Sequence, residues 1–248
     1  EKIREIIKIA YNNCEYYRIE WDKRILRPED INSYDDLKLL PVINKREILE
    51  NKILFQNSKI NRHVYTRKTS GSTGMTLHFK KDARALAIND AVMWRCYQWY
   101  GIDIGARQAR FWGIPIQNTA FLRERLKDFI LNRIRISAFD ITPGSSRRQY
   151  ERILKFKPAY LYGYTSAIYS FSRNIYEQGI DLNNLKIKAV ICTAEKMYSY
   201  HREFLESVFD CPIVDEYGSS ENGIIAFQCI KGNMHIMSDN LCIEFINE

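Results

Sequence analysis

The sequence has no run of the roughly 20 consecutive apolar residues that a helix needs to span a bilayer. A signal-peptide pattern is also missing, because residues 1–9 are charged and amphipathic. Proline and glycine are scarce, at 6 and 11 of 248 residues, which excludes collagen-like and Pro- or Gly-rich disordered chains. With 46% hydrophobic and 27% charged residues, the composition predicts a globular protein of one large domain or two small ones.

Cysteine pairs with the CxxC spacing of many zinc and redox sites are absent. The cysteines are six in number and scattered: Cys14, Cys96, Cys192, Cys211, Cys229 and Cys242. In a chain of this length, that spacing excludes a disulfide framework and favours reduced, mostly buried thiols. We therefore expect a cytoplasmic protein.

Nucleic-acid-binding motifs are missing as well, although the net charge is +7. Basic residues are interspersed with acidic ones, and the densest basic segment, Arg123–Arg135, also carries apolar residues at helical spacing. This pattern predicts a helix with a solvated basic face rather than a stripe that follows phosphates. We expect neither nucleic acid nor a membrane as partner. A basic module that binds an anionic polymer stays open as an alternative.

The first third of the chain predicts short helices followed by two strands. Residues 1–55 contain apolar residues at helical spacing, and Asn44 with Glu47 three residues later predicts a helix start. Strands are expected over residues 64–68 and 76–80. Asp82 is the expected cap of a long helix that ends before Gly101.

The rest of the chain predicts a regular α/β order. Strands are expected over residues 107–113, 159–164, 188–193 and 212–217, with helices over 146–156, from Thr165 or Ser166 to Gly179, and over 199–209. Strands that alternate with helices in this way form a parallel sheet, whose ligands bind at the carboxyl ends of the strands. A last strand-like alternation covers residues 241–246, and both ends of the chain read as cut.

Two polar loops stand out in this order. Residues Thr69, Ser70, Gly71, Ser72, Thr73 and Gly74 have little bulk, so backbone N–H groups and hydroxyls could surround a polyphosphate. The alternative is an ordinary turn between strands. The second loop, Tyr217-Gly218-Ser219-Ser220-Glu221, offers a flat ring and a hard carboxylate ligand for magnesium. Its alternative is a turn from a strand into a helix.

Together, these two loops resemble those of adenylate-forming acyl ligases. The chain is similar to the phenylacetate–coenzyme A ligase family over essentially its whole length, especially to members from capsular-polysaccharide loci. Further matching segments are residues 10–18, 40–45, 160–166, 215–221 and 232–236. The resemblance implies the large N-terminal domain of such an enzyme, with layered sheets and mainly parallel βαβ units. It predicts a helical lead-in over residues 1–60 and an ATP/AMP-binding core over residues 61–248.

The resemblance also implies a reaction and a set of site residues. ATP and a small carboxylate would form an acyl-adenylate, and coenzyme A would then take the acyl group. The first loop would hold the ATP phosphates, and Thr73, Tyr217 and Glu221 would act in catalysis, Glu221 as the magnesium ligand. The adenine side would be formed by Ala194, Glu195, Asp215, Glu216, Tyr217, Gly218 and Ser219, and the acyl pocket by Tyr162, Gly163, Tyr164 and Ser166.

The sequence departs from the family in two respects. The lysine common near the phosphate loop is missing, with Met75 and Leu77 in its place. The small C-terminal domain with its catalytic lysine lies outside this sequence, so we expect the chain to be incomplete for a full cycle.

Three questions stay open at this stage. Cys229 and His235 could form part of a zinc site, or they could be a buried thiol and an ordinary strand histidine. A polysaccharide-biosynthesis relative would pass the acyl group to a sugar or carrier instead of coenzyme A. The oligomeric state is also undetermined, with a dimer among the possibilities.

Overall fold

The computed structural model describes residues 1–60, 63–69, 76–113 and 118–245, and within residues 118–123 only the backbone. The chain divides into two compact units, Glu1–Leu86 and Ala87–Glu248. The expected division at residues 60 and 61 stays a prediction.

The first unit contains short helices and a hairpin. Its elements are α1 (Lys2–Asn13), α2 (Glu15–Asp22), the 3-10 turns η1 (Pro28–Asp30) and η2 (Asp35–Leu39), α3 (Lys45–Glu50), β1 (Val64–Lys68) and β2 (His78–Asp82). Ile7 of α1 and Trp21 of α2 are buried in a small core. The expected start of α3 is confirmed, because the Asn44 side chain accepts a bond from the Glu47 N–H over 3.0 Å. Strand β2 begins two residues later than expected.

The helix α4 (Ala83–Gln98) leads into the second unit. Asp82 caps it, since the Ala85 N–H donates to Asp82 Oδ1 over 2.7 Å. The helix is followed by Gly101, whose φ of +66° suits a glycine at the end of a helix. Both ends agree with the expectation from sequence.

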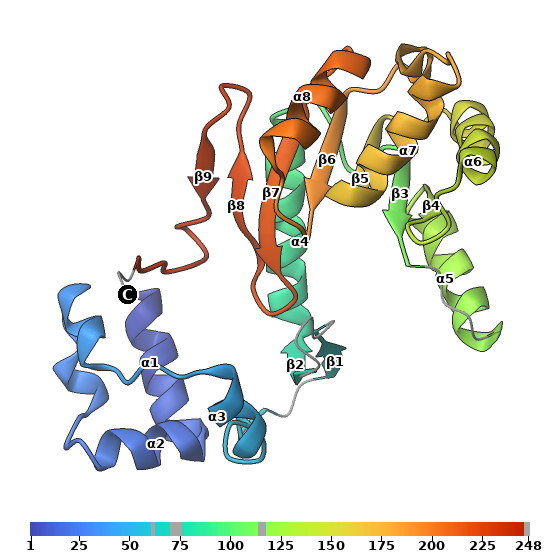
Figure 1. Ribbon diagram of the computed structural model, residues 1–248. Coiled ribbons are helices and arrows are strands. Elements are labelled where there is room, and N and C mark those ends of the chain that lie inside the picture. The colour runs from blue at the N-terminus through green and yellow to red at the C-terminus, as the bar shows by residue number, and fades with distance from the viewer. Residues whose placement is uncertain (61–62, 70–75, 114–117, 246–248) are drawn as a thin grey trace. The chain divides into compact units, whose positions relative to one another are not determined.

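The second unit is built on a seven-stranded sheet with the order β4-β3-β5-β6-β7-β8-β9 (Figure 1). Its strands are β3 (Gln108–Trp112), β4 (Arg133–Ser137), β5 (Tyr160–Tyr164), β6 (Ala189–Thr193), β7 (Ile213–Ser219), β8 (Gly223–Gln228) and β9 (Met234–Ile236). The strands from β4 to β7 pair in parallel, and β8 and β9 are antiparallel. The expected α/β class with a mainly parallel sheet is confirmed.

Helices cover both faces of this sheet. The remaining elements are α5 (Asn118–Ile130), α6 (Pro143–Phe156), α7 (Thr165–Glu177), η3 (Leu182–Leu185) and α8 (Ser199–Val208). Helices α6, α7 and α8 share one core with the sheet, in which Phe111 and Phe171 are fully buried. The other core contains Tyr97 of α4, also fully buried. Two packed layers of helix on a parallel sheet are the usual way to bury both faces of such strands.

Three local expectations are wrong, and so is the alternative of a turn into a helix after Tyr217. Helix α5 ends at Ile130, and residues 133–137 form the edge strand β4, because Arg133 to Ile136 alternate polar and apolar side chains at the period of a strand. Strand β7 continues to Ser219 because it pairs with β8, so a strand rather than a helix follows. Residues 241–245 are not a strand. Neither Thr165 nor Ser166 caps α7, because Tyr164 precedes the helix and Thr165 begins it.

Candidate functional site

The carboxyl ends of three neighbouring strands bring the expected site segments of the second unit together. Strand β5 ends at Tyr164, which pairs with Thr193 at the end of β6. Thr193 in turn pairs with Glu216 of β7. In a parallel sheet these ends lie along one edge, so the segments around Tyr162, Ala194 and Tyr217 are neighbours there.

Glu195 links the end of β6 to the beginning of α7. Its Oε2 accepts a hydrogen bond from the backbone N–H of Ser166 over 2.9 Å. Ser166 lies in the first turn of α7, where N–H groups lack partners within the helix and favour a negative charge. The preceding Ala194 has a φ of +65°, a left-handed conformation that turns the chain sharply after the strand. Glu195, expected on the adenine side, and Ser166, expected in the acyl pocket, are therefore in direct contact.

Glu216 lies on the face of the sheet that packs against α4 and is buried. Its two carboxylate oxygens accept bonds from the hydroxyls of Tyr162 and Tyr97, each over 3.1 Å. Burial raises the pKa of Glu216 above its ordinary value, while bonds from Thr193 and both tyrosines and the charge of Arg110 oppose this rise. The role of Glu216 beside adenine stays a prediction.

Asp215 lies on the opposite face of β7 from Glu216, as neighbours on a strand do. Its backbone N–H donates to Gln228 Oε1 over 3.2 Å, and Arg202 donates to the same oxygen over 2.9 Å. Burial raises the pKa of the Asp215 carboxyl, and the positive charge of Arg202 counteracts it.

Tyr217 is the aromatic residue that this strand end presents to solvent. Its side chain is 60% exposed, whereas Glu216 beside it is 7% exposed. Gly218 allows β7 to approach β8 closely, because a Cβ there would lie 2.5 Å from the carbonyl oxygen of Gly223. Ser219 is the last residue of β7 and Glu221 lies in the turn that follows, where Ser219 Oγ accepts from the Asn222 N–H over 3.0 Å. Glu221 is partly exposed in this turn.

An aromatic and cationic group surrounds the expected acyl-pocket residues. Trp112 of β3 stacks on Tyr164 with ring centroids 4.3 Å apart and lies 6.0 Å from Tyr162. The guanidinium of Arg110 lies 4.4 Å from the Trp112 ring and 5.1 Å from the Tyr162 ring. Sequence reasoning missed Arg110 and Trp112, because the adjacency of β3 and β5 is not visible in their spacing along the chain.

Gly163 differs from its neighbours because it is buried against β3. A Cβ at this position would lie 2.3 Å from the Phe111 carbonyl oxygen. The residue is therefore required for close packing of two strands, and its place in the acyl pocket stays a prediction.

The expected phosphate loop belongs to the first unit, and residues 70–74, including the expected catalytic Thr73, lie outside the described part of the chain. Thr69 is described and is hydrogen-bonded to Leu77. Its N–H donates to the Leu77 carbonyl over 3.0 Å, and its Oγ1 accepts from the Leu77 N–H over 3.0 Å. The roles of these residues toward ATP stay predictions.

Metal and membrane features are absent from the described residues. Within the ranges given above, no group of three or more His, Cys, Asp or Glu side chains could hold a metal ion. The His235 ring contacts Trp99 with centroids 5.7 Å apart, and the Cys229 N–H donates to the Asn233 carbonyl over 2.9 Å.

Across the described chain, no helix has the length and apolar character to cross a membrane. The six cysteines are free thiols.

Comparison with curated proteins identifies relatives over nearly the whole chain. It is 26% identical to Protein CapK of Staphylococcus aureus over 239 residues, covering 95% of this chain and 52% of that protein. It is 24% identical to the phenylacetate–coenzyme A ligase of Pseudomonas putida over 257 aligned positions, covering 100% of this chain and 56% of that enzyme. The chain is a homologue of CapK and of the phenylacetate–coenzyme A ligases. It spans about half the length of these relatives. No protein-family profile matches it.

Solved structures of 2-hydroxyisobutyryl-CoA ligase share the fold. The structure of that enzyme in the postadenylation state with 2-HIB-AMP superposes on this chain with a TM-score of 0.72 and 18% sequence identity. The superposition covers 94% of this chain and 50% of the ligase chain. The structure in the thioesterification state, with 2-HIB-AMP and CoA, superposes with a TM-score of 0.71 and 19% identity. It covers 94% of this chain and 51% of the ligase chain. The expected fold of an adenylate-forming ligase is therefore confirmed.

Proposed function

We propose that this chain is the nucleotide-binding part of an acid–thiol ligase that joins a small carboxylate to coenzyme A through an acyl-adenylate. The observation that carries the proposal is similarity to two phenylacetate–coenzyme A ligases over 100% and 93% of this chain. The shared fold with a ligase solved with an acyl-AMP and CoA supports it. Coenzyme A is the proposed acceptor in preference to a sugar or carrier, because two of the relatives are named as CoA ligases.

Two features of the strand ends support a nucleotide site there. The exposed ring of Tyr217 offers a stacking surface for adenine. Ala194 and Gly218 beside it have little or no side chain, so they add little bulk at this edge. Glu195, bound to the Ser166 N–H, would hold the adenine side of the site against the acyl side.

Magnesium would be held by Glu221 together with the phosphates of ATP. A partly exposed carboxylate in a turn is the kind of single protein ligand that magnesium takes beside substrate phosphates. When bound there, magnesium would supply positive charge to the phosphates, while an oxygen of the substrate carboxylate would bond to the α-phosphorus and pyrophosphate would leave. Zinc at Cys229 and His235 is not proposed, because two ligands do not complete a tetrahedral site.

An enzyme that uses ATP and coenzyme A, with six free thiols, would act in the cytoplasm.

The acyl group would lie beside Tyr162, Tyr164 and Trp112. Their stacked rings form a flat apolar surface, and Arg110 next to them adds a positive charge. This combination favours an aromatic carboxylate.

Isotope exchange between pyrophosphate and ATP tests the adenylation step directly. The full-length gene product would be assayed with a panel of aromatic and aliphatic carboxylates, with and without magnesium. We expect exchange that depends on both the carboxylate and the metal. Exchange with none of the acids would overturn the ligase assignment. A subsequent assay for CoA thioesters tests the acceptor separately.

A further inference from the structure

A cavity of about 660 Å³ lies beside β4, the edge strand of the sheet. Its lining comes from α5, the start of β4, the residue before β3 and the end of α6. None of the residues assigned above to nucleotide, metal or acyl group contributes to it. The volume lies in the range of about 300–1,000 Å³ that small-molecule sites occupy.

The cavity carries a surplus of positive charge. Its ionisable lining consists of six basic and two acidic side chains: Arg107, Arg125, Arg133, Arg135, Arg152, Lys155, Glu124 and Asp128. A concave surface with charges predominantly of one sign concentrates its electric field and attracts the opposite charge. The expected ligand is therefore an anion.

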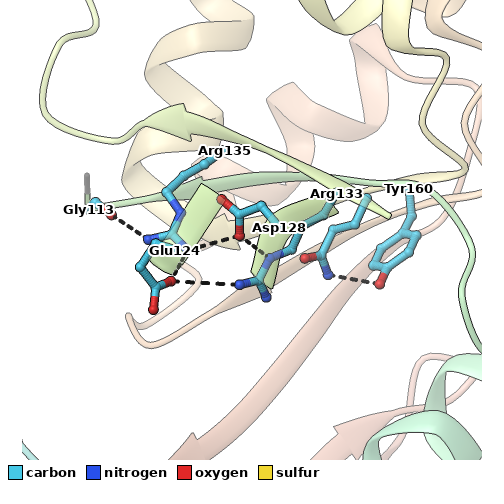
Figure 2. A network of polar contacts seen from close by, with 7 residues as sticks. Gly113, Glu124, Asp128, Arg133, Arg135 and Tyr160 are labelled. Carbon is cyan, nitrogen blue, oxygen red and sulfur yellow. Dashed lines mark hydrogen bonds and ion pairs between the residues drawn. The ribbon is translucent and has the colours of Figure 1, made fainter. Parts of the chain in front are cut away.

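The two acidic residues hold two of the arginines in place (Figure 2). Asp128 accepts from Arg133 over 2.5 Å and from Arg135 over 3.1 Å, and Glu124 accepts from Arg135. The side chains of Arg133 and Arg135 are only 7% and 12% exposed. Burial acts to raise the pKa of Glu124, but the hydrogen bond from Arg135 and nearby positive charges lower it overall. Two guanidinium groups are thus fixed before any ligand arrives.

The outer basic residues make bonds that leave their charge in place. Arg107 donates to the carbonyl oxygen of Phe156 over 3.2 Å, and Arg152 donates to that of Arg135 over 2.9 Å. Because a carbonyl is neutral, these bonds orient the side chains without cancelling their positive charge. Lys155 is exposed one turn of α6 beyond Arg152.

Apolar surface completes the lining. The side chain of Phe129 is 83% exposed, and the ring of Phe156 lies 5.7 Å from the guanidinium of Arg107. An inorganic anion would leave these rings uncovered, whereas an organic body would bury them.

We propose that this cavity binds a small organic phosphate that carries at least two phosphate groups next to an aromatic ring. Guanidinium groups bind phosphate oxygens in pairs, and several phosphates match several surplus charges. The ring would lie against Phe129 and Phe156. The proposal does not depend on the ligase reaction, because the site shares no residue with it.

Calorimetric titration of the chain tests the proposal with three probes: adenosine 3′,5′-bisphosphate, pyrophosphate and adenosine. We expect the bisphosphate to bind more tightly than pyrophosphate, adenosine to show no measurable binding, and affinity to fall as salt is raised. Arg152→Gln and Lys155→Gln should each weaken binding about five-fold at low salt, and the double variant should weaken it further than either. Arg148→Gln on the same helix lies outside the lining and should leave affinity unchanged.

Three results would overturn the proposal. One is the absence of bisphosphate binding by the wild-type chain. The second is equal affinity of the double variant and Arg148→Gln, with folding verified by circular dichroism. The third is loss of binding in Tyr217→Ala but not in the double variant, because the probe would then occupy the proposed nucleotide site. Equal affinity for pyrophosphate and bisphosphate would remove the aromatic part of the proposal.

Discussion

The hydroxyl of Tyr162 donates a hydrogen bond to Oε1 of Glu216 over 3.1 Å, on the face of the sheet that packs against α4. Tyr97 from α4 donates to the other oxygen over the same distance. A buried carboxylate therefore joins α4, β5 and β7 immediately before Tyr217, the exposed ring proposed to meet adenine. The contact places a titratable group directly beneath the candidate site.

Glu216 should make stability depend on pH. Its pKa is raised above the ordinary value of 4.5, so between that value and its folded pKa the native chain binds more protons than the unfolded chain. The free energy of unfolding should therefore fall as pH rises through this window. Glu216→Gln should flatten this dependence, measured by urea unfolding between about pH 4.5 and 8. Asp215, whose pKa is also raised, remains in both proteins, so their difference isolates Glu216. Parallel curves would contradict the prediction.

The hydrogen bond from the Tyr97 hydroxyl to Glu216 should stabilise the folded chain more than a hydrogen bond between neutral groups in the same core does. Tyr97→Phe leaves a buried carboxylate with one donor fewer and should cost about 1.5–3 kcal/mol. Tyr160→Phe is the matched control, because the hydroxyl of this buried tyrosine accepts a neutral bond from the Gln108 side-chain amide over 2.8 Å. Its expected cost is about 0.5–1.5 kcal/mol. Chemical denaturation at pH 7 measures both, and a larger loss for Tyr160→Phe would count against the prediction.

Gly163 should be intolerant of any side chain. In Gly163→Ala, the added Cβ would approach the Phe111 carbonyl oxygen to 2.3 Å and the Phe111 Cβ to 2.7 Å. Because backbone must then shift, we expect a loss of about 3 kcal/mol or more. Gly179→Ala is the control: its φ is +70° but no atom lies within 4 Å of the added Cβ, so only about 1–2 kcal/mol of backbone strain is expected. Equal losses in urea unfolding would show that space at Gly163 is not limiting.

The regular alternation of strand and helix patterns along the sequence made most of the fold predictable. The strands from β5 to β7 and the caps at Asn44 and Asp82 follow from local patterns of a few residues. The edge strand β4 was missed because its arginines resemble a continuation of the basic helix. Their charge is accommodated by Asp128 and Glu124, contacts that no local pattern reveals.

The sequence allowed us to predict which segments form the candidate site, but not which side chains contact one another there. The rule that ligands bind at strand ends correctly brought Tyr162, Ala194 and Tyr217 to one edge. It could not indicate that Glu216 faces inward while Tyr217 faces solvent, because that depends on the face packed against α4. Arg110 and Trp112 were missed since strand order, with β3 beside β5, is a property of the whole sheet.

Glu195 should stabilise α7 through the N–H of Ser166. Removing this acceptor in Glu195→Ala should cost about 0.5–2 kcal/mol, the usual range for a lost helix cap. Glu177→Ala at the other end of α7 is the control. It removes an exposed ion pair with Arg173 and should cost less than about 0.5 kcal/mol. Thermal unfolding distinguishes the two, and equal melting temperatures would mean that the Ser166 bond adds nothing to stability.

Tyr217 should contribute to nucleotide affinity and not to stability. Its ring is 60% exposed, so Tyr217→Ala removes little buried surface, yet it would remove the surface on which adenine is proposed to stack. A stacked base contributes roughly 1–3 kcal/mol, so binding of AMP should weaken by about five-fold to 150-fold. Tyr176→Ala provides the matched control, since that tyrosine is also 60% exposed but lies on α7, away from the strand ends. Titration of the full-length gene product with AMP, with urea unfolding in parallel, measures both quantities. If both variants bind AMP as the wild type does, adenine does not stack on Tyr217.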